Sequence, residues 1–182
     1  MADEAITYEQ YSDKILIMGI GNLLLGDEGL GVHAIRELWN AKLPDAVKLL
    51  DAGTAFIDAV SHLEDIHTLI IIDAIKGGKK PGTVYRIQVT PDLCMSYSAS
   101  MHDKSVIDMM RIAQYPLPDR VSVFGIEPEV IDWTMDISNT VSEAMPILIY
   151  AVLSEVNNSY ESLEVMDTCY QSTFNKIRIF NK

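Results

Sequence analysis

Three polar side chains have the types and positions that a divalent metal ion requires. Glu28 lies at the start of an expected helix, Asp73 ends an apolar run, and His102 begins a later expected helix. The positive end of a helix dipole favours an ionised Glu28 and a neutral His102, whose ring nitrogen can then coordinate. Two carboxylates and one imidazole suit hard and borderline metals and leave coordination positions open. The alternative is structural: Asp27 and Glu28 as first-turn helix acids, Asp73 as a strand-end cap, and His102 as a solvated side chain.

A glycine pair near the start of the chain suggests a different chemistry. The segment Gly19-Ile-Gly21 follows an apolar run, and Asp51 ends the next expected strand, as at the opening of a dinucleotide-binding fold. The third glycine of that fingerprint is missing because position 24 is Leu. Asp27 and Glu28 would also oppose a pyrophosphate at the helix N-terminus. These residues argue against a nucleotide-binding oxidoreductase.

The remaining reactive side chains give weaker signals. His33, His62 and His67 are expected to be surface or satisfied residues, and no HExxH or GxSxG motif is present. Acyl-enzyme chemistry therefore has no candidate nucleophile. Cys94 and Cys169 lie far apart without a CxxC spacing, which predicts reduced thiols and a cytoplasmic location.

Length and charge narrow the class of protein further. The chain has 182 residues, a formal net charge of −12 and 48% hydrophobic residues, which predict one domain with a real core. Its acidity argues against binding to nucleic acid or to an anionic membrane surface. The acidic N-terminus lacks the features of an export signal, and the longest apolar runs are too short to span a bilayer.

The order of the expected elements predicts how the candidate residues are positioned. Strands and helices alternate along one α/β domain over 1–182, which implies a mostly parallel, mixed sheet between helix layers. Active sites in such folds form beyond the carboxyl ends of the strands. Strands are expected at 14–21, 47–51, 67–73, 83–89 (at an edge or in a hairpin) and 120–126, and helices at 27–42, 55–63, 102–114 and 141–152.

Three features of the helices qualify this outline. Asp27 is expected to cap the first helix. Pro146 should kink the last helix or make it start later. Beyond Asn157, the extra C-terminal segment 158–182 is expected to form an edge strand or a loose tail.

Longer motifs go beyond these spacings. The chain carries IMGIGNLLLGDEGLGV at 17–32, DAGT at 51–54, LIIIDAI at 69–75 and GIEP at 125–128. In this order, and over about 14–153, they resemble the hydrogenase maturation proteases. These endopeptidases remove a C-terminal extension from the large subunit of nickel–iron hydrogenases.

The resemblance implies a catalytic and metal-binding set made of Glu28, Asp73 and His102. It also implies a substrate, the precursor of a nickel–iron hydrogenase large subunit, which is cleaved once after nickel has been inserted. The metal would polarise the scissile carbonyl and activate water, or a carboxylate would act as general base. Asp51 is a base candidate or, equally, a capping acid before Gly53. A non-catalytic nickel-sensing assembly factor would need the same ligands.

Overall fold

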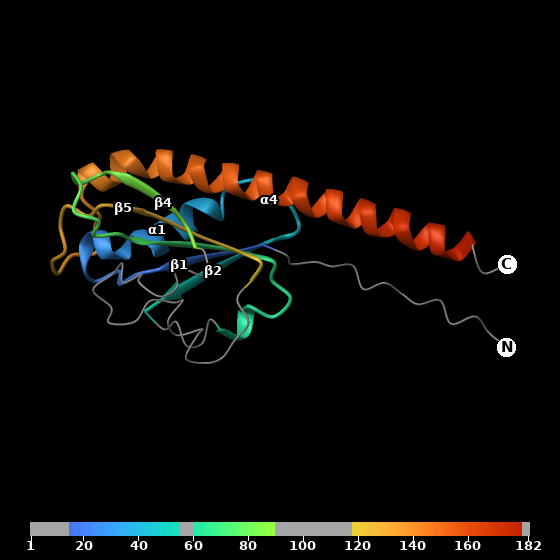
Figure 1. Ribbon diagram of the computed structural model, residues 1–182. Coiled ribbons are helices and arrows are strands. Elements are labelled where there is room, and N and C mark those ends of the chain that lie inside the picture. Colours follow the sequence, from blue (N-terminus) through green and yellow to red (C-terminus); the bar gives the residue numbers. More distant parts are fainter. Residues whose placement is uncertain (1–14, 55–59, 90–117, 180–182) are drawn as a thin grey trace.

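The computed structural model describes residues 15–54, 60–89 and 118–179, and for 161–179 it describes the backbone alone. Figure 1 shows a sheet under a long helix. The elements are β1 (Ile15–Ile20), η1 (Gly26–Gly29), α1 (Leu30–Leu38), β2 (Val47–Gly53), η2 (Val60–His62), β3 (Thr68–Ala74), β4 (Val84–Gln88), β5 (Arg120–Ile126) and α4 (Asn139–Ile179).

The five strands form one sheet in the order β2-β1-β3-β5-β4. β1, β2, β3 and β5 are parallel, and β4 runs antiparallel to β5 at the edge. The α/β class and the mostly parallel sheet are confirmed. Because the four parallel strands point the same way, the segments that follow them emerge at one edge of the sheet.

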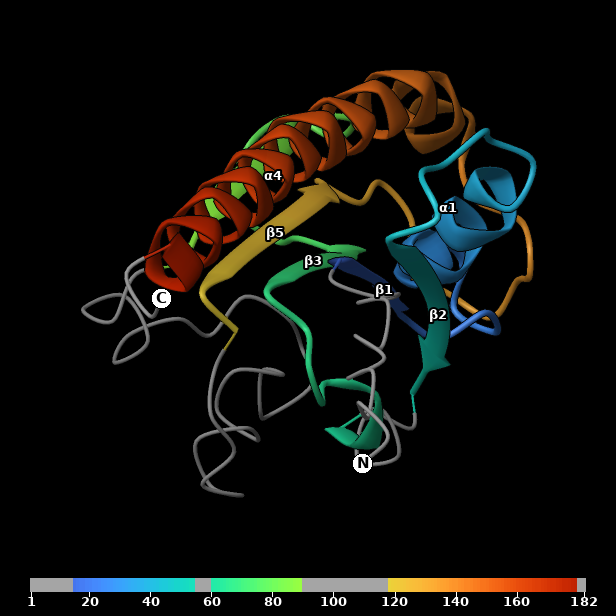
Figure 2. The same ribbon diagram turned by 90° about the vertical axis from the view of Figure 1, so that its right-hand side faces the viewer.

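One face of the sheet packs against both α1 and α4, which Figure 2 shows on the same side. The first core cluster joins Ile15 and Ile17 of β1 to Leu30 and Ile35 of α1 and to Val152 of α4. Alternate side chains of a strand point to opposite faces, so an unbroken apolar run fills both sides of the sheet.

On the opposite face, Leu16 and Met18 of β1 pack with Leu63 and Ile66, which follow η2. The helix expected at 102–114 lies outside the described residues. Residues 55–59 of the helix expected at 55–63 also lie outside the described residues. The rest of that expected helix contains the 3-10 turn η2.

The last helix is much longer than expected. It begins at Asn139 and continues to Ile179, so Pro146 does not delay its start, and the expected strand or tail beyond Asn157 is wrong. Pro146 is exposed, so water can satisfy the backbone carbonyl left without its donor. No Gly or Pro follows Pro146 before Ile179, which leaves nothing to end the helix.

At 1.5 Å per residue, α4 is about 60 Å long, and in Figure 1 it extends past the end of the sheet. Despite that length, no helix in the described part of the chain is apolar enough over a sufficient span to cross a membrane.

Candidate functional site

Glycines bring the turn that carries Glu28 against the carboxyl edge of the sheet. Gly21 has a φ of +149°, and a Cβ atom there would overlap the backbone oxygen of Glu28. A Cβ atom at Gly31 would likewise overlap the backbone oxygens of Ile20 in β1 and Ile72 in β3. The glycines after β1 therefore serve close packing of η1 and α1 on the sheet.

The two candidate carboxylates meet at this edge. Glu28 in η1 is buried, with 4% of its surface exposed. Asp73 follows the apolar part of β3, and one of its oxygens accepts a hydrogen bond of 2.8 Å from the backbone N–H of Ala74. The pKa of Asp73 is raised to about 7: burial is the largest cause, the hydrogen bond from Ala74 opposes it, and the negative charge of Glu28 adds to it. Two desolvated, mutually repelling carboxylates are an arrangement that a cation stabilises.

The histidines differ in what the structure says of them. His102 lies outside the described residues, so its place as a third ligand stays a prediction. Within the part of the chain that is described, no three His, Cys, Asp or Glu side chains form a group able to hold a metal ion. His33 on α1 has a buried Nε2 atom with no hydrogen-bond partner among the described residues. His67 lies 2.8 Å from Asp119, as expected for a satisfied surface residue.

Asp27 is not a helix cap, and this expectation is wrong. Neither η1 nor α1 has a side-chain cap, and Asp27 is 1% exposed and points to residues far along the chain. Its Oδ2 accepts hydrogen bonds of 2.8 Å from the N–H groups of both Glu129 and Val130. Ser138 donates to Oδ1 through its N–H at 2.6 Å and to Oδ2 through its hydroxyl at 2.9 Å. Asp27 thus fixes the loop between β5 and α4.

Backbone hydrogen bonds join the same two segments. Gly26 N–H donates to the carbonyl of Thr134 at 2.7 Å, and Thr134 N–H donates to the carbonyl of Leu24 at 3.2 Å. Ser138 also accepts a hydrogen bond of 3.3 Å from Val141 N–H and so caps α4. The cap formed by Ser138 was not predicted from the sequence. The available signal was a serine three residues before Val141, the first apolar position of the helix.

Glu127 anchors a second loop at this edge. The N–H groups of Gly77 and Lys79 donate to Oε2 at 2.9 and 3.0 Å, that of Gly78 donates to Oε1 at 3.3 Å, and the hydroxyl of Tyr85 also donates to Oε2. Burial by itself would raise the pKa of Glu127. The hydrogen bonds from Tyr85 and the three N–H groups outweigh it, and its pKa is lowered.

Asp51 lies two residues before the end of β2 and is exposed. Its Oδ1 accepts a hydrogen bond of 3.0 Å from Gly53 N–H. This is the geometry of the capping alternative, in which the side chain stabilises the turn after the strand.

The fold and the paired acids define an α/β protein with an anionic site at the carboxyl edge of a parallel sheet. The family model for hydrogenase maturation proteases matches residues 32–155, about two thirds of the chain. The chain therefore belongs to the hydrogenase maturation protease family. The match ends at residue 155, so the last part of α4 lies beyond it.

Individual relatives agree with this assignment. The chain is 36% identical to the hydrogenase expression/formation protein HoxM of Azotobacter vinelandii over 65% of this chain and 60% of that protein. It thus spans about three fifths of that relative. It is 30% identical to the hydrogenase 2 maturation protease of Escherichia coli over 80% of this chain and 92% of that protein. The structure of the hydrogenase maturating endopeptidase HybD from E. coli superposes with a TM-score of 0.70 and 28% identity, over 80% of this chain and 93% of that one.

Proposed function

We propose that this protein is a cytoplasmic endopeptidase that removes the C-terminal extension of a nickel–iron hydrogenase large-subunit precursor after nickel insertion. The observation that carries the proposal is the pairing of two acids, the buried Glu28 and the half-buried Asp73, at the carboxyl edge of the sheet. Membership of the maturation protease family supports a peptidase activity, and the similarity to the hydrogenase 2 maturation protease of E. coli supports a hydrogenase substrate.

The nickel in this proposal belongs to the substrate. Glu28, Asp73 and His102 offer two oxygen ligands and one nitrogen ligand but no thiolate. Such a set binds a free divalent ion only moderately and is suited to completing the coordination of a metal already held by the precursor's cysteines. Cleavage then follows nickel occupancy of the precursor.

Hydrolysis itself requires a water molecule placed against the scissile carbonyl. The water oxygen bonds to the carbonyl carbon and the C–N bond breaks. One proton of the water is transferred to the leaving amine, and the other is released when the new carboxyl group ionises. Either the substrate's metal polarises the carbonyl, or one of the carboxylates removes a proton from the water. Because Glu28 is buried, the dielectric constant around it is low, and this strengthens the electrostatic interactions on which both routes depend.

The decisive experiment incubates purified protein with nickel-loaded precursor and detects a shortened product by mass spectrometry. Glu28→Gln and Asp73→Asn should abolish the product, whereas Glu37→Gln, an exposed acid on α1, should leave it unchanged. Precursor without nickel should stay intact, and adding nickel to the protease alone should not rescue it. Cleavage of nickel-free precursor by metal-stripped protease would contradict the proposal. Nickel-dependent binding without cleavage would identify an assembly factor instead.

The third ligand has its own test. Affinity for Cd²⁺ or Zn²⁺, as surrogates for nickel, should weaken as pH falls through the histidine range and should weaken further in His102→Ala. An unchanged affinity in that variant would make His33, whose Nε2 atom is buried, the next residue to test as the third ligand.

A further inference from the structure

An exposed apolar patch lies beside the candidate site. It consists of Leu24, which is 50% exposed, Val130 at 41%, Trp133 at 79% and Met135 at 61%. The four residues come from the two segments joined by the Leu24–Thr134 and Gly26–Thr134 hydrogen bonds. Large apolar side chains gathered on one exposed surface are typical of protein-binding sites.

The backbone that presents this patch is fixed. Asp27 accepts hydrogen bonds from the N–H groups of Glu129 and Val130, which precede Trp133 in the chain. It also accepts two from Ser138, which follows Trp133. Because the loop is already ordered, a partner that covers Trp133 loses little conformational entropy from it. A tryptophan on an ordered backbone is the kind of residue that dominates interface energies.

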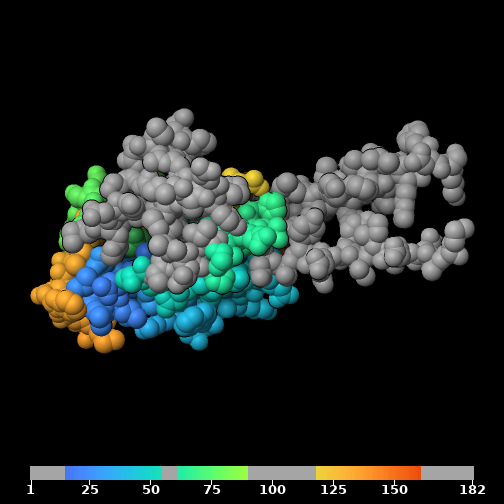
Figure 3. Space-filling view, turned by 90° about the horizontal axis from the view of Figure 1, so that it is seen from below, coloured from blue at the N-terminus to red at the C-terminus, as the bar shows by residue number. Residues whose placement is uncertain are grey.

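The position of the patch points to one partner. Leu24 and Thr134 flank η1, whose Glu28 is the candidate ligand. Figure 3 shows the orange region around residues 128–140 next to the blue region around residues 20–30 at one end of the molecule. A protein whose cleavage segment reaches Glu28 would therefore lie over this surface.

The charges around the patch describe that partner further. Three exposed acids, Glu129, Asp132 and Asp136, lie in the same loop as Trp133. Apolar side chains flanked by Lys or Arg would complement this surface. A second copy of the chain would bring like charges together, with a net charge of −12 on each copy.

We propose that Leu24, Val130, Trp133 and Met135 form the docking surface for the precursor, which contacts it through an apolar segment flanked by basic residues. The inference rests on the proposed function and adds the surface through which the substrate is recognised. The patch supplies binding energy away from the reacting bond, so its loss raises KM and leaves kcat unchanged.

Binding can be observed without cleavage. The sequence contains two tryptophans, and Trp39 is also exposed, at 59%, beyond the end of α1. In protein labelled with 5-fluorotryptophan and carrying Glu28→Gln, the ¹⁹F resonance of Trp133 should shift when unlabelled nickel-loaded precursor is added. The resonance of Trp39 should not move. The two signals are assigned from Trp133→Phe and Trp39→Phe.

Kinetics gives a second readout. Trp133→Ala should raise KM by about tenfold to a hundredfold with kcat unchanged, whereas Trp39→Ala should change neither. Asp132→Lys should raise KM and reduce its dependence on salt. Equal effects of the two tryptophan variants, or an unchanged KM, would overturn the docking surface. A Trp133 resonance that shifts with protein concentration in the absence of precursor would overturn it in favour of self-association.

The two proposals fail separately. A Trp133 shift with no cleavage by the wild-type protein retains the docking surface and overturns the peptidase. Cleavage by the wild-type protein with an unaffected Trp133→Ala retains the peptidase and overturns the docking surface.

Discussion

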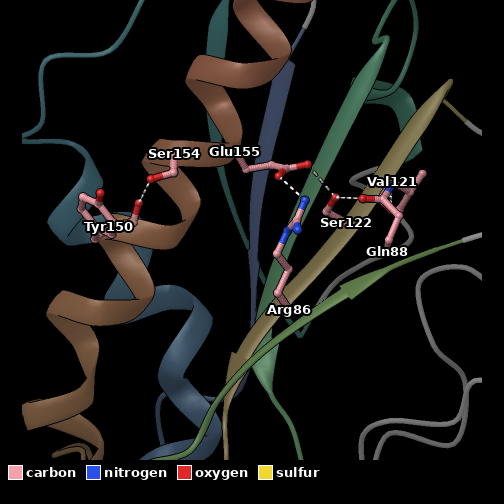
Figure 4. Close-up of polar contacts among 7 residues, drawn as sticks. All are labelled: Arg86, Gln88, Val121, Ser122, Tyr150, Ser154 and Glu155. Carbon is pink, nitrogen blue, oxygen red and sulfur yellow. Dashed lines mark hydrogen bonds and ion pairs between the residues drawn. The ribbon is translucent and has the colours of Figure 1, made fainter.

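Two buried carboxylates connect α4 to the rest of the protein, and they use different partners. At the start of the helix, Asp27 accepts hydrogen bonds from three backbone N–H groups and a serine hydroxyl. Further along, Glu155 pairs with Arg86 of β4 at 2.7 Å and accepts a hydrogen bond of 3.0 Å from the hydroxyl of Ser122 in β5 (Figure 4). Both acids are buried, with 1% and 7% of their surfaces exposed.

The difference lies in what each partner does when the acid is removed. Backbone N–H groups of a loop held at several points cannot turn away as a side chain can, so losing their acceptor leaves partly buried donors without a partner. The side chain of Arg86 is 57% exposed and can turn into solvent. The acid with backbone partners holds the loop beside Glu28 in place, while the acid with the arginine only tightens the helix on the sheet.

The largest effect is expected from Asp27→Ala. It should lower the free energy of unfolding by about 3 kcal/mol, because four hydrogen bonds to one buried carboxylate are lost together. Urea denaturation measures the change, with the exposed Glu37→Ala as control, expected within about 0.5 kcal/mol of the wild type. A loss below about 1 kcal/mol would show that the loop rehydrates freely.

Asp73 sharpens the comparison because it is half-buried and has one described backbone donor, the N–H of Ala74. Its pKa is raised from 3.8 to about 7, so the folded protein keeps a proton that the unfolded chain loses between these values. Stability therefore falls as pH rises through this window and is lowest above pH 7. In metal-free protein, Asp73→Asn should raise the free energy of unfolding at pH 8 by about 2 kcal/mol. This is less than the full pKa shift would give, because solvent screens the half-buried carboxylate. At pH 4 the two proteins should be equal, and a pH-independent difference would contradict this reading.

The local sequence predicted the elements better than it predicted these partners. β1, β3, β4 and β5 lie within a residue or two of their expected positions, because continuous or alternating apolar residues determine which strands can be buried. The same local reasoning assigned Asp27 to its own helix, because the N–H groups that it binds lie more than a hundred residues away. The charge of Glu28 acts on Asp73, so the two acids lie near each other, as the convergence of loops at the carboxyl edge of a parallel sheet predicts. Their role as metal ligands stays a prediction.

The end of α4 shows a second limit. Polar residues beyond Asn157 suggested that the helix had ended, yet a polar composition does not stop a helix that meets no Gly or Pro. The sequence pattern described the packed part of the helix and gave no measure of how far it continues past the sheet.

Glu155→Gln tests the other half of the comparison. It should lower the free energy of unfolding by about 1–2 kcal/mol, less than Asp27→Ala, because the amide keeps its contact with Ser122 while the freed guanidinium of Arg86 hydrates. A double-mutant cycle with Arg86→Ala isolates the energy of the ion pair. A loss equal to that of Asp27→Ala would remove the distinction between backbone and side-chain partners.

The smallest effect is expected where a backbone-held acid loses only its side-chain donor. Tyr85→Phe removes the hydroxyl hydrogen bond to Glu127 and leaves the N–H groups of residues 77–79 in place. The pKa of Glu127 lies below its ordinary value of 4.5, so the stability that it contributes is present above pH 4.5 and is lost as pH falls through the lower folded-state pKa. In Tyr85→Phe that folded-state pKa should move up, and the melting temperature should therefore fall less steeply with acid below pH 4.5. Melting curves at pH 3 to 7, compared with Glu127→Gln, measure the change; an unaltered acid dependence would mean that the backbone donors alone set this pKa.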